Sequence, residues 1–302
     1  MAISRNQLVK ELEPGLNALF GLEYKQYENQ TSDIYTTESS DRAFEEEVML
    51  SGFAQAQVKP EGGGVVYDNA QETFTARYTN ETIALAFAIT EEAIEDNLYD
   101  RLASRYTKAL ARSMASTKNV KGASTLNNGN PGGTFTSGDG VTLFNTAHPT
   151  IAGTFSNTLA TASDLNETSL EQALIDINAF TDERGLKIAA KGVKMIIPSA
   201  LQFVAERLMK SQGRTSTADN DINAVRSMGM IPQGYRVNNY LTDADAFFIL
   251  TDVPNGMKHF NRAPLTTKME GDFDTGNVRY KARERYVFGV SDPRGIFSSP
   301  GA

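Results

Sequence analysis

A long excursion of the chain between Val48 and Thr79 is the feature that most constrains what this sequence can fold into. Its tip carries one lysine and a glycine run, namely Lys59, Gly62, Gly63 and Gly64, and few large apolar side chains anchor it. At about 3.3 Å per residue, each limb of such a hairpin reaches about 50 Å from the body. A two-stranded hairpin alone is at best marginally stable in water. We therefore expect neighbouring copies of the chain to complete it, which indicates a protein that builds an assembly.

The composition limits the chemistry that is available. The 302 residues are 40% hydrophobic and 22% charged, as in an ordinary globular protein, and the absence of cysteine excludes disulfides and thiolate chemistry. No apolar run approaches the roughly eighteen residues that a membrane span needs, so no membrane partner is expected. Residues 1–5 have no signal-peptide apolar core. We expect a soluble protein made in a cytoplasm.

Charge is unevenly distributed along the chain, whose net charge is −8. Residues 1–50 hold ten acids, among them Glu45, Glu46 and Glu47, against four bases, whereas residues 257–302 hold eight bases against five acids. The acidic total argues against a protein that wraps nucleic acid with a basic surface. The opposed ends can attract each other, within one chain or between chains.

The first half of the chain predicts an arm, a strand and a long helix. Residues 1–47 are polar and weakly patterned, with a short leucine-bearing helix that Pro14 and Gly15 interrupt and an extended stretch over 24–40. Apolar residues at odd positions over 83–89 predict a half-buried strand. Apolar residues at every fourth position over 94–114 predict a helix over 91–117, about 40 Å long at about 1.5 Å per residue. A loop rich in glycine and asparagine is expected over 122–140.

The second half predicts a compact α+β unit and a long closing strand. Residues 168–171 fit a capping box, residues 192–198 read as a buried strand that proline ends, and Ser199 is expected to cap another helix. Short strands are predicted at 235–240 and 246–250, after a polar loop over 210–221. This packing predicts an α+β domain over 166–255, inserted into a discontinuous domain of residues 81–165 and 256–302.

The closing strand, residues 278–290, has a mostly apolar face at its even positions and a basic face at its odd positions. The bases, which we call the basic ladder, are Arg279, Lys281, Arg283 and Arg285. They follow one another about 7 Å apart, two strand residues each. Three interpretations stay open: a solvated strand face, pairing with acids of an adjacent subunit such as those at 45–47, or contact with packaged nucleic acid.

The inventory for catalysis is thin. The chain has two histidines, His148 and His259, far apart in sequence, and we expect structural hydrogen bonds for both. It has no HExxH pattern and no Cys/His cluster that would predict a zinc site. The glycine run at 62–64 is not followed by the lysine and hydroxyl residue of a phosphate-binding loop. The sequence therefore predicts no catalytic residue, no cofactor and no metal site.

The order of segments resembles the major capsid protein of tailed bacteriophages, with the Hong Kong 97 phage-type shell fold. This order is an acidic arm, a glycine-tipped loop, a strand, a long helix, an inserted α+β domain and a long closing strand, and the resemblance covers nearly all the chain. Three local stretches, residues 143–149, 241–248 and 289–297, are similar to the Mu-like head-subunit branch.

The resemblance implies a role for each segment. Residues 1–47 would be an N-terminal arm, 48–80 an extended loop over a neighbouring subunit, 81–165 with 256–302 the peripheral domain around a spine helix, and 166–255 the axial domain. The polar loop at 210–221 would be an axial loop. Some family members cross-link their shells by a lysine–asparagine isopeptide bond. Lys59 stands at a suitable place, but no motif for its partner is present.

The resemblance also implies partners. The chain would assemble with itself into hexameric and pentameric capsomers of an icosahedral head enclosing double-stranded DNA without sequence specificity. Its further partners would be a separate scaffolding protein, a portal and a decoration protein. Assembly would take place in the bacterial host cytoplasm, and the protein would then be part of the virion capsid. Two alternatives stay open: an encapsulin-like compartment subunit with protein cargo, and a soluble α+β enzyme that uses carboxylates.

Overall fold

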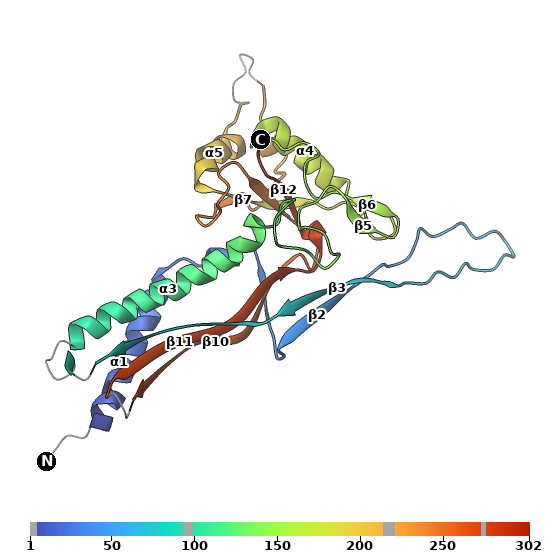
Figure 1. Cartoon of the computed structure of the whole chain (residues 1–302). Coiled ribbons are helices and arrows are strands. Elements are labelled where there is room, and N and C mark those ends of the chain that lie inside the picture. Colours follow the sequence, from blue (N-terminus) through green and yellow to red (C-terminus); the bar gives the residue numbers. More distant parts are fainter. Residues whose placement is uncertain (1–4, 91, 94–98, 214–220, 273–275) are drawn as a thin grey trace.

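The computed structural model describes residues 5–90, 92–93, 99–213, 221–272 and 276–302. Figure 1 shows an elongated lower part built on a long helix and long strands, a rounded upper part with several short helices, and a hairpin that extends sideways from their junction. This is a mixed helix and sheet fold, as the sequence predicts.

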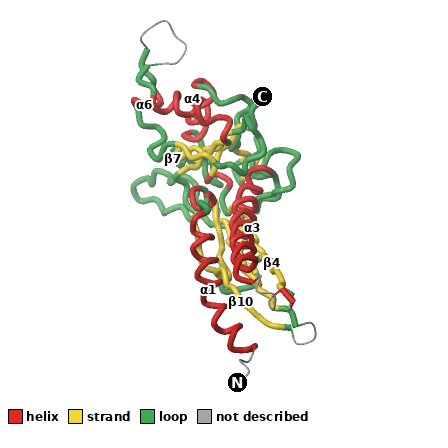
Figure 2. Tube along the Cα trace, turned by 90° about the vertical axis from the view of Figure 1, so that its left-hand side faces the viewer, coloured by secondary structure: helices red, strands yellow, loops and turns green. Residues whose placement is uncertain are grey.

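The lower part is built on a four-stranded sheet in the order β1-β10-β11-β4. Its strands are β1 (Thr36–Ser39), β10 (Met257–Gly271), β11 (Val278–Val290) and β4 (Glu81–Ile89). β1 runs parallel to β10, and the other two pairs are antiparallel. The predicted strands at 83–89 and 278–290 are confirmed. The even positions of β11 are buried because they face two helices, α1 (Arg5–Gln26) and α3 (Tyr99–Asn127), which lie side by side over the sheet (Figure 2).

The long helix α3 ends ten residues later than the predicted end at residue 117. Its apolar face continues through Ala123 and Leu126, which are fully buried. Gly122 does not end the helix but permits close packing, since a Cβ at this position would lie 2.4 Å from Cγ2 of Thr31. The 29 residues span about 43 Å at about 1.5 Å per residue.

The N-terminal segment is more helical than the sequence predicts. α1 runs through Pro14 without interruption, and the stretch predicted as extended begins with the end of α1 and a 3-10 turn, η1 (Gln30–Asp33). Leu16 and Phe20 are buried in the same cluster as the inner face of β11. We attribute the survival of the helix to this packing, which outweighs the roughly 3 kcal/mol that an interior proline costs.

The hairpin consists of β2 (Phe44–Leu50) and β3 (Glu72–Thr79), which form their own two-stranded antiparallel sheet. Strand pairing ends at Leu50 and Glu72, and residues 51–71 form a tip beyond it, joined at its start by a backbone hydrogen bond from Ser51 to Gln71. We call these residues the loop tip.

The upper part contains a second sheet in the order β12-β9-β7-β8. Its strands are β7 (Gly192–Ile197), β8 (Tyr235–Val237), β9 (Phe247–Thr251) and β12 (Ile296–Ser299). Its other elements are α4 (Glu167–Asn178), α5 (Gln202–Lys210), α6 (Ala224–Ser227), the 3-10 turns η2 (Ser199–Leu201) and η3 (Pro293–Gly295), and the small hairpin β5 (His148–Thr150) with β6 (Gly153–Phe155). Because β12 pairs with β9, the C-terminal strand lies in this sheet, whereas the predicted division assigns 256–302 to the other unit.

Two predicted caps differ from the structure. Asn166, not Thr168, caps α4, because its side chain accepts a bond from the backbone of Ser169 while the Ser169 hydroxyl accepts one from the backbone of Asn166. Ser199 begins a 3-10 turn that has no side-chain cap.

Two predictions lie partly outside the described residues. They are the start of the long helix, at 91 and 94–98, and most of the polar loop, at 214–220. Within the described part of the chain, no helix is both long and apolar enough to span a bilayer.

Candidate inter-subunit surfaces and a buried polar network

The loop tip exposes apolar side chains that its own chain does not cover. Val58 is 96% exposed and Tyr67 92% exposed, and Val65 and Val66 are each 66% exposed. Hydrogen bonds within the tip include Ser51 N to Gln71 O, Ala54 N to an Asp68 carboxylate oxygen, and Gly63 N to Pro60 O. From the body, Arg184 donates to the Asn69 carbonyl oxygen at 2.6 Å. The tip is therefore an apolar surface on an extended support, the kind of surface that marks an interaction site.

The predicted contact residues at the tip lie together, as their sequence positions require. Lys59, Gly62, Gly63 and Gly64 surround a turn in which Gly62 adopts a φ of +73°. A side chain at Gly63 would meet the Pro60 ring at 2.8 Å. Gly62 and Gly63 therefore serve the turn itself, whereas a Cβ at Gly64 would meet no atom within 4 Å.

The three acids Glu45, Glu46 and Glu47 each have a partner within the same chain. Glu45 accepts a hydrogen bond from the Ser40 hydroxyl at 2.8 Å, which lowers the pKa of Glu45. Glu46 lies 3.7 Å from Arg77 across the hairpin. Glu47 accepts bonds from Lys258 and from Ser291. In the single chain these acids are held by partners of their own chain. Their pairing with the basic ladder of a neighbouring subunit stays a prediction.

The basic ladder lies on the face of β11 that is opposite the helices. The antiparallel register places Arg279, Lys281 and Arg283 beside Ala88, Ala86 and Ala84 of β4. Arg279 pairs with Asp272. For Lys281, Arg283 and Arg285, no ion pair with a carboxylate of the described residues is present. The basic ladder is thus a row of bases on β11 that lies beside the alanine side chains of β4.

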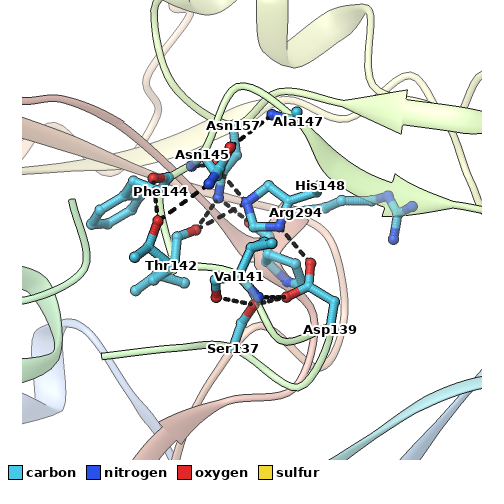
Figure 3. Close-up of polar contacts among 12 residues, drawn as sticks. Ser137, Asp139, Val141, Thr142, Phe144, Asn145, Ala147, His148, Asn157 and Arg294 are labelled. Atoms are coloured by element: carbon cyan, nitrogen blue, oxygen red, sulfur yellow. Dashed lines mark hydrogen bonds and ion pairs between the residues drawn. The ribbon is translucent and has the colours of Figure 1, made fainter. Parts of the chain in front are cut away.

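A buried polar network lies near the junction of the two parts (Figure 3). His148 Nδ1 lies 2.5 Å from Asp139 Oδ2, and His148 Nε2 lies 3.0 Å from Asn157 Oδ1 and 3.2 Å from the Leu143 carbonyl oxygen. Ser137 donates a hydrogen bond to the other oxygen of Asp139. Burial alone would raise the pKa of Asp139, but the bonds from His148 and Ser137 outweigh it and lower that pKa.

Serine, histidine and aspartate in one network raise the question of nucleophilic catalysis. A catalytic serine bonds to the histidine, which bonds in turn to the aspartate. Here Ser137 bonds to Asp139 instead, and the His148 ring is fully buried with oxygen acceptors at both nitrogens. His148 therefore holds the surrounding loops together through buried hydrogen bonds, which agrees with the structural role expected for it.

Arg294 is the centre of a second buried charge cluster at the same junction. Its guanidinium donates to Glu183 Oε1 at 2.7 Å, to the Thr181 carbonyl oxygen at 2.7 Å and to Asp292 Oδ1 at 3.3 Å. Arg294 is 1% exposed, and burial raises the pKa of Asp292 even beside this cation. Breaking a buried ion pair leaves an uncompensated charge, so this cluster holds the junction in one arrangement.

Sequence reasoning missed both clusters and the buried Lys258. Asp139 lies in a glycine-rich loop, and Arg294 lies 111 residues from Glu183, so no local spacing connects them. Two stretches that carry the family resemblance, residues 143–149 and 289–297, contain His148 and Arg294, but the resemblance does not indicate their buried contacts. Among the residues that the structure describes, no group of three or more histidine, cysteine or acidic side chains is arranged to hold a metal ion.

Comparison with known proteins supplies the remaining evidence. A family model described as phage capsid protein matches residues 73–299, about three quarters of the chain. No curated protein matches the sequence.

Three solved structures share the fold at low sequence identity. The virus-like particle from Pyrococcus furiosus is 12% identical over 94% of this chain and 97% of that chain, with a TM-score of 0.54. A chain of Mycobacterium phage Che8 is 14% identical over 91% and 93%, also at 0.54. The capsid of Myoviridae phage XM1 is 12% identical over 89% of each chain, again at 0.54. At these identities the likeness concerns the fold.

Proposed function

Because the chain belongs to the phage capsid protein family, we propose that it is the major subunit of an icosahedral phage head and that neighbouring copies complete its extended loop. The family is structural and not enzymatic, and the chain is a structural protein of the virion capsid with the Hong Kong 97-type fold. The Mu-like branch stays a prediction from the local sequence stretches.

The observation that carries the proposal is the exposed loop tip. Burial of apolar surface contributes about 25 cal/mol per Å² of free energy. Tyr67 is 92% exposed in the single chain, so its side chain contributes most of this free energy only when another molecule covers it. The body contacts residues 51–71 through Arg184, which donates to the Asn69 carbonyl oxygen at 2.6 Å, and this polar contact leaves the apolar side chains at 58–67 uncovered. A shell of identical subunits supplies such a cover to every copy at once.

We assign the segments as the resemblance implies. Residues 1–47 are an arm, 48–80 the extended loop, 81–165 with 256–302 a peripheral domain, and 166–255 an axial domain that meets its copies in hexameric and pentameric capsomers. Support comes from the two separate sheets and from the hairpin between them. The strand β12 pairs within the axial sheet, so residues 296–299 belong with that unit in this proposal.

Other partners are proposed on chemical grounds. The basic ladder suits an acidic surface of an adjacent subunit, and the net charge of −8 disfavours DNA as its main ligand. Packaged DNA, a scaffolding protein, a portal and a decoration protein complete the proposed partner set, with assembly in the bacterial host cytoplasm. The encapsulin-like alternative has less support, because the matching family model is that of phage capsid proteins. Nuclease-resistant DNA inside purified particles would separate the two.

Deletion of residues 59–67 tests the proposal. We expect the variant to unfold at the same temperature as the full chain, because these residues touch no core, but to remain as small oligomers. Size-exclusion chromatography and negative-stain microscopy measure the outcome.

Lys59→Ala is the matched control, because it keeps the loop and removes only the amine that an isopeptide bond needs. We expect this variant to form shells that dissociate into single chains in detergent. Shells of normal size and yield from the deletion variant would refute the role of the loop tip.

A further inference from the structure

The base of the extended loop is joined to the body by one buried lysine. Lys258 lies on β10, is 4% exposed, and donates a hydrogen bond from Nζ to Glu47 Oε1 on β2. Its Nζ also lies 3.1 Å from Glu38 Oε1 on β1. One ammonium group therefore connects the hairpin with two strands of the main sheet.

The other oxygen of Glu47 continues the connection to the second strand of the hairpin. The Ser291 hydroxyl donates to Glu47 Oε2, and the same hydroxyl oxygen is bonded to the hydroxyl of Tyr78 on β3. Both strands of the hairpin thus end on one group of side chains, which we call the clamp: Glu47, Tyr78, Lys258 and Ser291. The electrostatics agree, since burial alone would lower the pKa of Lys258 but its bonds to Glu47 and Glu38 raise it.

Open space flanks the clamp on two sides. A cavity of about 400 Å³ lies between Glu47–Met49 and the turn of Pro254 and Asn255. Another of about 320 Å³ lies between residues 32–38 and the same turn. Apolar packing at the base is limited to a small cluster that includes Ala76, Tyr78 and Phe260. The body therefore does not enclose the base of the hairpin. The clamp restrains the hairpin at its base, and Arg184, which donates to the Asn69 carbonyl oxygen at 2.6 Å, contacts it farther out.

The neighbouring acid Glu46 provides a contrast. It pairs with Arg77 at 3.7 Å, and both side chains are about half exposed. This pair lies within the hairpin and links it to nothing else, because side chains alternate between the two faces of a strand. The two adjacent glutamates thus differ in their partners: of the two, Glu47 bonds to the body and Glu46 bonds within the hairpin.

We propose that Lys258 and Glu47 are positioning residues that set the angle at which the extended loop leaves the body. The inference rests on the proposed function of that loop as a contact between subunits. About fifteen residues separate Glu47 from the tip, or about 50 Å at about 3.3 Å per residue, so a rotation of about 10° at the clamp moves the tip by about 9 Å. Such a displacement takes the loop tip out of register with a fixed site on a neighbour.

The absence of native cysteine makes a direct measurement simple. Spin labels are placed at Gln172→Cys on α4 and at Val65→Cys in the loop tip. A second pair replaces Val65 by Leu50→Cys, at the end of the paired strands, and so isolates the hairpin from its tip. Double electron–electron resonance on the unassembled full chain then reports the direction of the hairpin.

Four variants are compared in this labelled background. Lys258→Met and Glu47→Gln remove the charge pair while keeping the side-chain length, Lys258→Arg keeps the charge, and Glu46→Gln is the matched control. We expect Lys258→Met and Glu47→Gln to shift and broaden both distance distributions, with a larger shift at Val65. Lys258→Arg and Glu46→Gln should keep the wild-type distributions.

The outcomes separate the clamp from the function of the loop. Unchanged distributions in a folded Lys258→Met or Glu47→Gln chain overturn the proposal, whatever the assembly yield. If circular dichroism shows that Lys258→Met does not fold, the Glu47→Gln variant tests the proposal instead. It is the milder change, because the glutamine amide oxygen can still accept the hydrogen bond from Ser291. Changed distributions with normal shell formation would support the clamp and refute the proposed function of the loop instead.

Discussion

His259 is expected to make the stability of this protein depend on pH in a defined direction. The ring is 5% exposed, stacks on Phe288 with centroids 4.5 Å apart, and its Nδ1 lies 3.2 Å from the Thr37 hydroxyl. Its Nε2 has no hydrogen-bond partner among the described residues. Burial, with a further contribution from the charge of Lys118, lowers the pKa of His259 to about 4.

The sign follows from proton binding in the two states. In the unfolded chain a histidine has a pKa of about 6.5, so between about pH 6.5 and pH 4 the unfolded state binds a proton that the folded state does not. The free energy of unfolding is therefore unaffected by His259 above about pH 6.5 and falls as the pH drops toward 4. The 2.5-unit difference in pKa corresponds to about 3 kcal/mol once the pH is below both values.

The substitution His259→Leu removes the titration and keeps a side chain of similar size. Urea unfolding of the unassembled chain should show a smaller loss of stability between pH 7 and pH 4.5 in the variant than in the wild type, by roughly 2–3 kcal/mol. Thr37→Val is the control, because it removes the bond to Nδ1 but leaves the burial that causes the shift. Its pH dependence should follow the wild type.

A direct check is the proton NMR titration of the ring, since the chain has only two histidines to assign. The signal lost in His259→Leu should titrate near pH 4 in the wild type. A midpoint near 6.5, or parallel stability curves for the wild type and His259→Leu, would show that the ring is not buried as the structure has it.

Two further predictions concern the hairpin base and the ladder. Gly289→Ala would place a Cβ 2.3 Å from the ring of Tyr78, so we expect the free energy of unfolding to fall by about 1–3 kcal/mol, measured by thermal unfolding. The control Gly271→Ala, whose Cβ would meet no atom within 4 Å, should change little. Equal melting temperatures for the two variants would contradict this packing. Arg279→Glu with Arg283→Glu should reduce the assembly yield and its salt dependence, and a double variant that assembles like the wild type would leave the ladder as a solvated face.

Sequence patterns predicted those elements in which side chains alternate regularly between a buried and an exposed face. β11 spans Val278–Val290 as predicted: its even positions lie under the helices, and its odd positions are exposed from 279 to 283 but become buried toward Gly289, which lies beside Tyr78. β7 ends directly before Pro198, as expected of a residue that cannot donate to a strand ladder. These rules use only neighbouring residues and a buried or exposed side.

The sequence could not predict features that depend on distant partners. Nothing near Pro14 indicates that the helix continues, because the packing that holds it involves β11 more than 260 residues later. Glu47 and Lys258 are separated by 211 residues. Lys59 and the glycines at 62–64 are predicted contacts because of their place in the loop, whereas the acids at 45–47 and the basic ladder are predicted from charge, and charge does not tell which acids already have partners in the same chain.

The division of stabilisation between body and loop explains why this chain depends on its copies. The body holds its charges in buried pairs, such as Arg294 with Glu183, whose side chains are each 2% exposed. The loop tip has no such interactions. The loop tip has five exposed large apolar side chains, namely Phe53, Val58, Val65, Val66 and Tyr67. At about 1.5 kcal/mol each when covered, they represent about 7–8 kcal/mol per chain, which is comparable to the 5–15 kcal/mol that stabilise a whole domain. A single chain leaves this free energy unrealised. If neighbouring copies cover the loop tip, as proposed, every subunit of a closed shell gains it. The proposed clamp then determines how much of it is gained, because it sets the direction of the loop.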